Sequence, residues 1–196
     1  KYTAAKNAFF IETTATQEWA NKPYWPIIES IDKLFNFISK LPEDRQQEIY
    51  QEVRERLGAD GIILSKVIPR LSTIVGEFDA NYKFSQNEDD IFFEKLKDFY
   101  IGLASSNNPL VLMFDDIHNW DQGSVQFFTY FMDYVYDSSI YIVLSMREDE
   151  TMKVQELYDL IVQSAKEGRI GIINLQNLNY DEVDELTLGI FGNIYN

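Results

Sequence analysis

The stretch Pro109–Asp121 reads Pro-Leu-Val-Leu-Met-Phe-Asp-Asp-Ile-His-Asn-Trp-Asp, an apolar run that ends in two adjacent carboxylates. A short, almost unbroken apolar run predicts a strand buried on both faces, of the kind found in parallel α/β sheets. Such sheets bind ligands at the carboxyl ends of their strands. Asp115 and Asp116 are therefore candidate functional residues, and the stretch predicts the metal-binding strand of a nucleotide-hydrolysing domain.

The composition predicts an acidic globular protein. Of 196 residues, 45% are apolar and 15% aromatic, which is enough for a sizeable core and argues against disorder. There are 17 Lys and Arg against 32 Asp and Glu, a net charge of −15. So acidic a chain is a poor partner for nucleic acid, which needs clustered Lys and Arg, and for anionic membrane surfaces.

Cysteine and histidine usage excludes several kinds of site. The absence of cysteine excludes disulfides, thiolate zinc sites and a cysteine nucleophile, and the one histidine, His118, excludes a His-rich metal cage. The sequence has no apolar run of transmembrane length and no signal-peptide pattern at its start. We therefore expect a cytoplasmic protein, and, because the chain begins at Lys1 rather than Met, an excised domain.

Apolar spacing, together with breaks at Gly and Pro, predicts the remaining elements. Besides the opening stretch, strands are expected at residues 7–14, 139–146 and 170–175. Helices are expected at residues 28–40, 42–56, 60–75 with an interruption at Pro69 and an N-cap at Asp60, 89–106 with a cap at Ser85 or Asn87, 124–136, 152–166 and 180–188, and residues 17–26 are expected to form a loop.

The order of these elements predicts an α/β fold with a parallel sheet, because strands alternate with helices from residue 109 onward. We expect a single domain over residues 1–196. Residues 1–26 would supply a strand and a loop, 27–106 a helical insertion, and 107–196 the half of the sheet that carries the Asp pair. Aromatic stripes on two helices, at Phe92, Phe93, Phe99 and Tyr100 and at Phe127, Phe128, Tyr130 and Phe131, are expected in the core, with a partner-binding surface as the alternative.

Four stretches of the chain resemble the AAA-like, P-loop ATPase domain of large multidomain bacterial sensor kinases and regulators. The stretches are Phe9-Phe10-Ile11 with Gln17 and Pro23-Tyr24, Gly61 through Val67-Ile68-Pro69 to Ile74-Val75-Gly76, Val111 to Asp121 with Ser124, and Leu144-Ser145-Met146-Arg147 to Glu150. The third resembles the family's Walker B segment, the strand whose terminal carboxylates handle metal and water. The resemblance implies a three-layer, parallel-sheet fold of the STAND type and covers nearly the whole chain.

The chain also departs from the family's pattern. Thr13-Thr14-Ala15-Thr16-Gln17 stands where the family often has Gly-Lys-Phe-Asp-Gln, and Asn119 separates His118 from Trp120. No G-x-x-x-x-G-K-[ST] phosphate loop is present. In the family this loop lies upstream of the strand at Phe9, so we expect the first strand, phosphate loop and first helix to precede Lys1. That first strand would lie between the strand ending at Met146 and the one around Ile172.

The resemblance implies Mg²⁺ and ATP as cofactors and assigns roles to the site residues. Asp115 would bind the metal, in part through water, and Asp116 would orient the attacking water, as phosphoryl transfer requires. His118 would contact the nucleotide as a sensor of the γ-phosphate, or would contact a neighbouring segment of the chain. Arg147 resembles a polar sensor position with a catalytic role.

Each of these residues also has a structural alternative. The Asp pair could simply end a strand and begin a turn, and His118 could be a structural hydrogen-bonding group. Arg147 could form a salt bridge to Glu148, Asp149 or Asp116. Trp120 is expected to anchor the loop by packing. Asp121 and Ser124 are expected to start the next helix.

Three functions fit the sequence. The first is a regulatory ATPase domain whose partners are the neighbouring domains of a larger signalling protein, with a second copy of the chain as a further candidate partner. The second is a non-catalytic interaction module on a degenerate NTPase fold. The third is a metal-dependent phosphohydrolase that uses the Asp pair.

The absence of the phosphate loop generates a direct prediction. Backbone N–H groups and the lysine of that loop supply most of the phosphate affinity, so this chain should show no tight binding of Mg-ATP in isothermal titration calorimetry. A micromolar dissociation constant would contradict the prediction.

Overall fold

The computed structural model describes residues 8–84, 87–105 and 108–192, and it divides the chain into two compact units, Lys1–Val162 and Gln163–Asn196. The elements of the first unit are, in chain order, β1 (Phe9–Thr14), η2 (Gln17–Asn21), α1 (Trp25–Ile38), α2 (Glu43–Leu57), η3 (Ala59–Ile62), α3 (Ile63–Val67), η4 (Pro69–Leu71), α4 (Ser72–Val75), α5 (Glu88–Leu103), β2 (Leu110–Asp115), η5 (Ile117–Asn119), α6 (Gln122–Val135), β3 (Ile140–Leu144) and η6 (Glu148–Val154). Helix α7 (Gln155–Lys166) begins in the first unit and ends in the second, which also contains α8 (Tyr180–Phe191).

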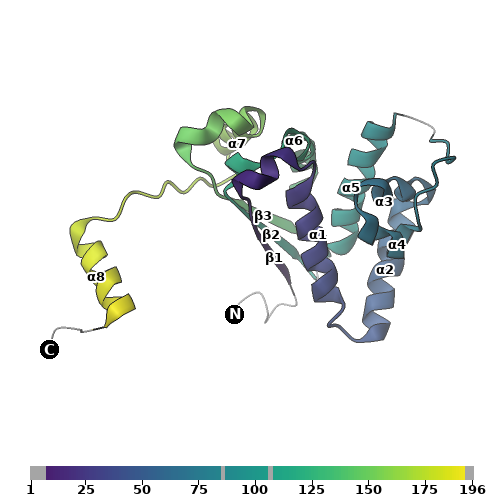
Figure 1. The fold of residues 1–196 in the computed structure, drawn as a ribbon, viewed down its shortest axis with the longest axis horizontal. Helices are drawn as coiled ribbons and strands as arrows, with labels where there is room; N and C mark the ends of the chain where they lie inside the picture. Colours follow the sequence, from purple (N-terminus) through teal and green to yellow (C-terminus); the bar gives the residue numbers. More distant parts are fainter. Residues whose placement is uncertain (1–7, 85–86, 106–107, 193–196) are drawn as a thin grey trace. The chain divides into compact units, whose positions relative to one another are not determined.

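The three strands form one parallel sheet in the order β1-β2-β3, so the fold is α/β as predicted (Figure 1). Strand β2 lies in the centre, and Asp115 ends it beside Thr14 of β1. The STAND-type, P-loop architecture and the single-domain interpretation stay predictions.

One face of the sheet is buried under α1 and α6. Phe9 of β1 meets Phe37 of α1 edge-to-face at a centroid distance of 5.3 Å, and Phe114 of β2 meets Phe128 of α6 at 4.9 Å. Helices α2, α3 and α5 pack together beyond α1 (Figure 1). The side chain of Tyr100 on α5 reaches Ser30 of α1, with 2.6 Å between the hydroxyl oxygens. Burial raises the pKa of the Tyr100 hydroxyl.

The aromatic stripes lie mainly in the core, as predicted. Phe92, Phe99, Tyr100, Phe127, Phe128 and Phe131 are all buried. They interlock α5 with α6; for example, Tyr100 and Phe131 lie 5.5 Å apart between ring centroids. The same aromatic layer supports the buried face of β2 through Phe128.

Within the residues that the structure describes, the other face of the sheet is open to solvent, which corrects the expectation of strands buried on both faces. Phe10, Val111 and Tyr141 form one row across it, and Phe10 and Tyr141 are 42% and 67% exposed. Among the described residues, β3 also pairs only with β2 and leaves its second edge unpaired. An apolar sequence shows that a strand can be buried on both faces. Burial also requires a second layer of helices on the sheet, which the sequence of the strand does not reveal.

Three further expectations were wrong in detail. Residues 170–175 form no strand: Ile173 and Leu175 are 85% and 90% exposed, and an apolar segment becomes a strand only when it pairs. Asp60 caps no helix: it lies within η3, whose N-cap is Gly58, and its carboxylate accepts a hydrogen bond from the Tyr82 hydroxyl at 2.9 Å. Helix α1 begins at Trp25, earlier than predicted, because Pro26 occupies its first turn, where a missing N–H costs little.

Other predicted boundaries are confirmed. Asn87 caps α5 by accepting the Asp89 N–H at 3.0 Å, and the predicted alternative, Ser85, lies outside the described residues. In the second unit, α8 begins at Tyr180 as predicted, with a capping box of Asn179 and Glu182 at its start, and it continues to Phe191, beyond the predicted end at Leu188. No helix in the described part of the chain is long and apolar enough to cross a membrane.

The one-sided burial predicts unequal effects for two aromatic substitutions. Phe128→Ala should lower the free energy of unfolding by about 3–5 kcal/mol, because it leaves a cavity beneath β2. Tyr141→Ala, on the open face, should cost less than about 0.5 kcal/mol. Urea unfolding of the two variants measures the difference; equal losses would show that the open face is covered in solution.

Candidate functional site

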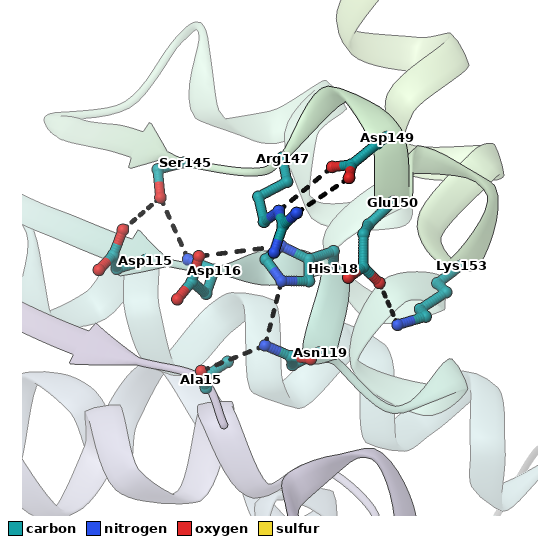
Figure 2. A network of polar contacts seen from close by, with 10 residues as sticks. All are labelled: Ala15, Asp115, Asp116, His118, Asn119, Ser145, Arg147, Asp149, Glu150 and Lys153. Carbon is teal, nitrogen blue, oxygen red and sulfur yellow. Dashed lines mark hydrogen bonds and ion pairs between the residues drawn. The ribbon is translucent and has the colours of Figure 1, made fainter. Parts of the chain in front are cut away.

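The candidate site is built where β2 and β3 end, and it centres on Ser145 (Figure 2). The Ser145 hydroxyl donates a hydrogen bond to Asp115 Oδ1 and accepts the Asp116 N–H at 3.1 Å. The Ser145 backbone continues the link: its N–H donates to the Phe114 carbonyl at 2.9 Å, and its carbonyl accepts the Ile117 N–H at 3.0 Å. Ser145, which directly follows β3, thus makes hydrogen bonds to four consecutive residues at the end of β2, Phe114 to Ile117, and these bonds are called the clamp.

This clamp explains how two adjacent carboxylates point to different places. Asp116 adopts the left-handed conformation, with φ 59° and ψ 43°, which few residues other than glycine and asparagine or aspartate tolerate. The turn leaves Asp115 at Ser145 and directs Asp116 Oδ1 toward His118, 3.9 Å from Nδ1. The Asp116 side chain is 44% exposed, so its carboxylate also faces solvent.

His118 lies behind the carboxylates and is only 5% exposed. Its Nε2 lies 3.2 Å from Asn119 Nδ2, and the same amide nitrogen donates to the Ala15 carbonyl at 3.5 Å (Figure 2). His118 therefore hydrogen-bonds within the loop, which agrees with the structural alternative for this residue. Its contact with a nucleotide stays a prediction.

Trp120, Asp121 and Ser124 have the structural roles predicted for them. Trp120 is 4% exposed and packs on Phe114 and Phe128, with centroid distances of 5.2 and 4.7 Å. Asp121 caps α6: it accepts the Ser124 N–H at 3.0 Å and the Ser124 hydroxyl at 2.6 Å. These contacts fix the loop that carries Asp116 and His118 against the core.

Arg147 lies at the rim of the site and pairs with Asp149. Its Nε and Nη2 donate to the two Asp149 carboxylate oxygens at 3.2 and 2.9 Å, and its side chain is 61% exposed. This hydrogen bonding raises the pKa of the Arg147 guanidinium and lowers that of the Asp149 carboxyl. The salt bridge to Asp149 that was one alternative for Arg147 is therefore present. The guanidinium also interacts electrostatically with Asp116. A sensor role for Arg147 stays a prediction.

Glu150 also lies at this rim, where it pairs with Lys153. The hydrogen bond from Lys153 is the main cause that lowers the pKa of the Glu150 carboxyl. Glu150 is thus paired with its own cation rather than with a group of the Asp pair.

The oxygen donors suit Mg²⁺, while the site offers little to a polyphosphate. Asp115 and Asp116 are hard ligands at a strand end, and Mg²⁺ commonly takes one or two carboxylates and several waters. No group of three or more Asp, Glu or His side chains in the described residues is arranged to hold a metal alone. The chain contains no glycine-rich loop with a lysine to bind phosphates.

Sequence reasoning missed Ser145 and Asn119 as parts of the site. Ser145 was visible as a small polar residue directly after an apolar strand, but its partners depend on the parallel register that sets Phe114 beside Leu144. Asn119 was noticed only as an insertion between His118 and Trp120, and its partner Ala15 lies 104 positions away in the sequence.

The chain is similar in sequence to part of a known signalling protein. The chain is 33% identical over 124 residues to hybrid signal transduction histidine kinase G of Dictyostelium discoideum. The matched segment covers 59% of this chain and 3% of that protein's length. No family model matches the chain, and no solved structure matches it.

The clamp predicts a specific effect of Ser145→Ala. The change removes the acceptor of the Asp116 N–H, so amide hydrogen exchange at Asp116 should become faster, and the free energy of unfolding should fall by about 1–3 kcal/mol.

Ser138→Ala provides the control. The Ser138 hydroxyl accepts the Ile140 N–H at the opposite end of β3, so its loss should leave exchange at Asp116 unchanged. Equal exchange rates at Asp116 in wild type and Ser145→Ala would contradict the clamp.

Proposed function

We propose that this chain is the carboxylate-bearing half of a nucleotide site in a regulatory ATPase domain of a larger signalling protein. The observation that carries the proposal is the pair of carboxylates at the end of the central strand, held in different directions by Ser145. Asp115 would hold Mg²⁺ together with waters, and Asp116, half exposed, would orient the attacking water. Nucleotide state would then change how the domain packs against its neighbours.

The similarity to a signalling kinase supports the context. The Dictyostelium protein is named as a hybrid signal transduction histidine kinase, and the matched segment is 3% of its length. A short segment within so long a chain is consistent with one domain among many. The ATP, the Mg²⁺ and the regulatory role belong to the proposal.

The uncovered parts of the sheet support the same proposal. The free edge of β3 and the exposed row from Phe10 to Tyr141 lie where an added strand and its helix would pack. A further parallel strand with its crossover helix would bury both features at once. The phosphate-binding loop joining such a strand to its helix would open at the carboxyl end of the sheet, near Asp115.

The open face also favours a second candidate, the non-catalytic interaction module. Exposed Tyr141 and Val143, at 67% and 37%, offer an apolar surface to a protein partner without any nucleotide. The sequence encoded upstream of Lys1 separates the two functions. A glycine-rich loop ending in Lys-Ser or Lys-Thr supports the ATPase, and its absence supports the module.

A titration with Mn²⁺, a paramagnetic substitute for Mg²⁺, tests the metal part of the proposal on this chain. Nuclear magnetic resonance should show weak binding, with broadening centred on Asp115 and Asp116, because one or two carboxylates alone bind such ions weakly. Asp115→Asn should remove the broadening.

Asp133→Asn, an equal change of charge on the exposed surface of α6, should leave the broadening in place. Tight binding in the absence of nucleotide would instead favour a metal-dependent phosphohydrolase. Broadening centred elsewhere would contradict the metal role of Asp115.

A further inference from the structure

His118 places a buried imidazole directly behind a half-exposed carboxylate. The ring is 5% exposed, and its Nδ1 has no hydrogen-bond partner within the described part of the chain. The nearest charged atom recorded for it is Asp116 Oδ1, at 3.9 Å. Buried polar nitrogens are rarely left without a partner, so the group that Nδ1 faces, the Asp116 carboxylate, is a candidate for an interaction with it.

The contacts of the other ring nitrogen determine which one carries the proton. His118 Nε2 lies 3.2 Å from Asn119 Nδ2, and this amide nitrogen also donates to the Ala15 carbonyl. The Ala15 carbonyl oxygen can only accept a hydrogen bond, so the nitrogen of the Asn119 amide, not its oxygen, must face it. That amide nitrogen can only donate. His118 Nε2 must therefore accept, and in the neutral ring the proton lies on Nδ1, facing Asp116.

A series of contacts from Ala15 through Asn119 and His118 to Asp116 links the ends of β1 and β2 (Figure 2). Ala15 follows β1 directly, and its N–H donates to the Asp115 carbonyl at 2.9 Å. The Ala15 carbonyl accepts a hydrogen bond from the Asn119 side-chain amide, and the same amide nitrogen contacts His118 Nε2. The other ring nitrogen of His118, Nδ1, faces Asp116. The backbone of Asp116 is fixed independently by Ser145.

We propose that His118 is a positioning residue for Asp116. As the neutral Nδ1–H tautomer it directs its N–H toward Asp116 Oδ1, 3.9 Å away, and would orient the carboxylate by electrostatic attraction, so that Oδ2 faces solvent. The solvent-facing oxygen is where the attacking water of the proposed function would bind, so the catalytic meaning of this arrangement rests on that function. The tautomer and the orientation of Asp116 rest on the contacts alone.

Nuclear magnetic resonance of the ¹⁵N-labelled chain at pH 8 tests the tautomer without ambiguity, because His118 is the one histidine. Long-range nitrogen–proton correlations should show Nδ1 protonated, and three-bond couplings should show one χ1 rotamer for Asp116. An Nε2–H ring, a mixture of tautomers or a rotationally averaged Asp116 would overturn the proposal.

Two pairs of variants separate positioning from a merely structural role. Asn119→Asp replaces the hydrogen-bond donor to Nε2 with an acceptor, so the ring proton should move to Nε2 and Asp116 should lose its single rotamer. The control, Asn81→Asp, makes the same charge change in an exposed loop and should alter neither the tautomer nor the rotamer. His118→Asn can place an amide N–H near the position of Nδ1 and should keep Asp116 ordered, while His118→Gln places it near Nε2 and should not. If Asp116 is as ordered in His118→Gln and Asn119→Asp as in the wild-type chain, the proposal is overturned. If these variants fail to fold, the wild-type measurement decides.

The experiment also separates this proposal from the proposed function. Absence of Mn²⁺ broadening at Asp115 together with an Nδ1–H tautomer overturns the metal role and retains the positioning role. An Nε2–H tautomer together with broadening at Asp115 retains the metal role of Asp115 and overturns the positioning role of His118.

Discussion

The hydrogen bonds of the Ser145 hydroxyl, to the Asp115 carboxylate and from the Asp116 N–H, are the interaction on which the site depends. They join the end of β3 to the end of β2 and hold a left-handed residue between them. Without this clamp, Asp116 would be free to return to an ordinary backbone conformation, and the two carboxylates would no longer be separated in direction. The buried aromatic layer under β2, through Phe114 and Trp120, keeps the clamped turn in place.

The same sheet that holds the site is uncovered on one side. Its buried face rests on α1 and α6, while Phe10, Tyr141 and Val143 remain exposed on the other. Parallel sheets are usually covered on both faces. Under the proposed function, one added strand–loop–helix segment would cover the open edge and face of β3 and would supply the phosphate loop.

Local pattern predicted much of the fold, and long-range pairing decided the rest. The strand at Leu110–Asp115 and the existence of α1 and α5 follow from apolar spacing, and the start of α5 follows from its cap Asn87; these signals are local, although they placed the start of α1 three residues too late. Residues 170–175 have the composition of a strand but no pairing partner, and composition cannot reveal that. Asp115 and Asp116 were found because they interrupt an apolar run, whereas Ser145 and Asn119 gain their roles only from partners brought near by the sheet register.

The affinity for Mg-ATP of the chain extended through the sequence encoded upstream of Lys1 tests the central claim most directly. We expect Mg²⁺-dependent binding in the extended protein, weakened at least about tenfold, or about 1.4 kcal/mol, by Asp115→Asn. The same substitution should leave the unfolding transition within the range of an exposed control such as Asp133→Asn. An extended protein that binds no nucleotide, or one whose affinity is unchanged by Asp115→Asn, would contradict the account.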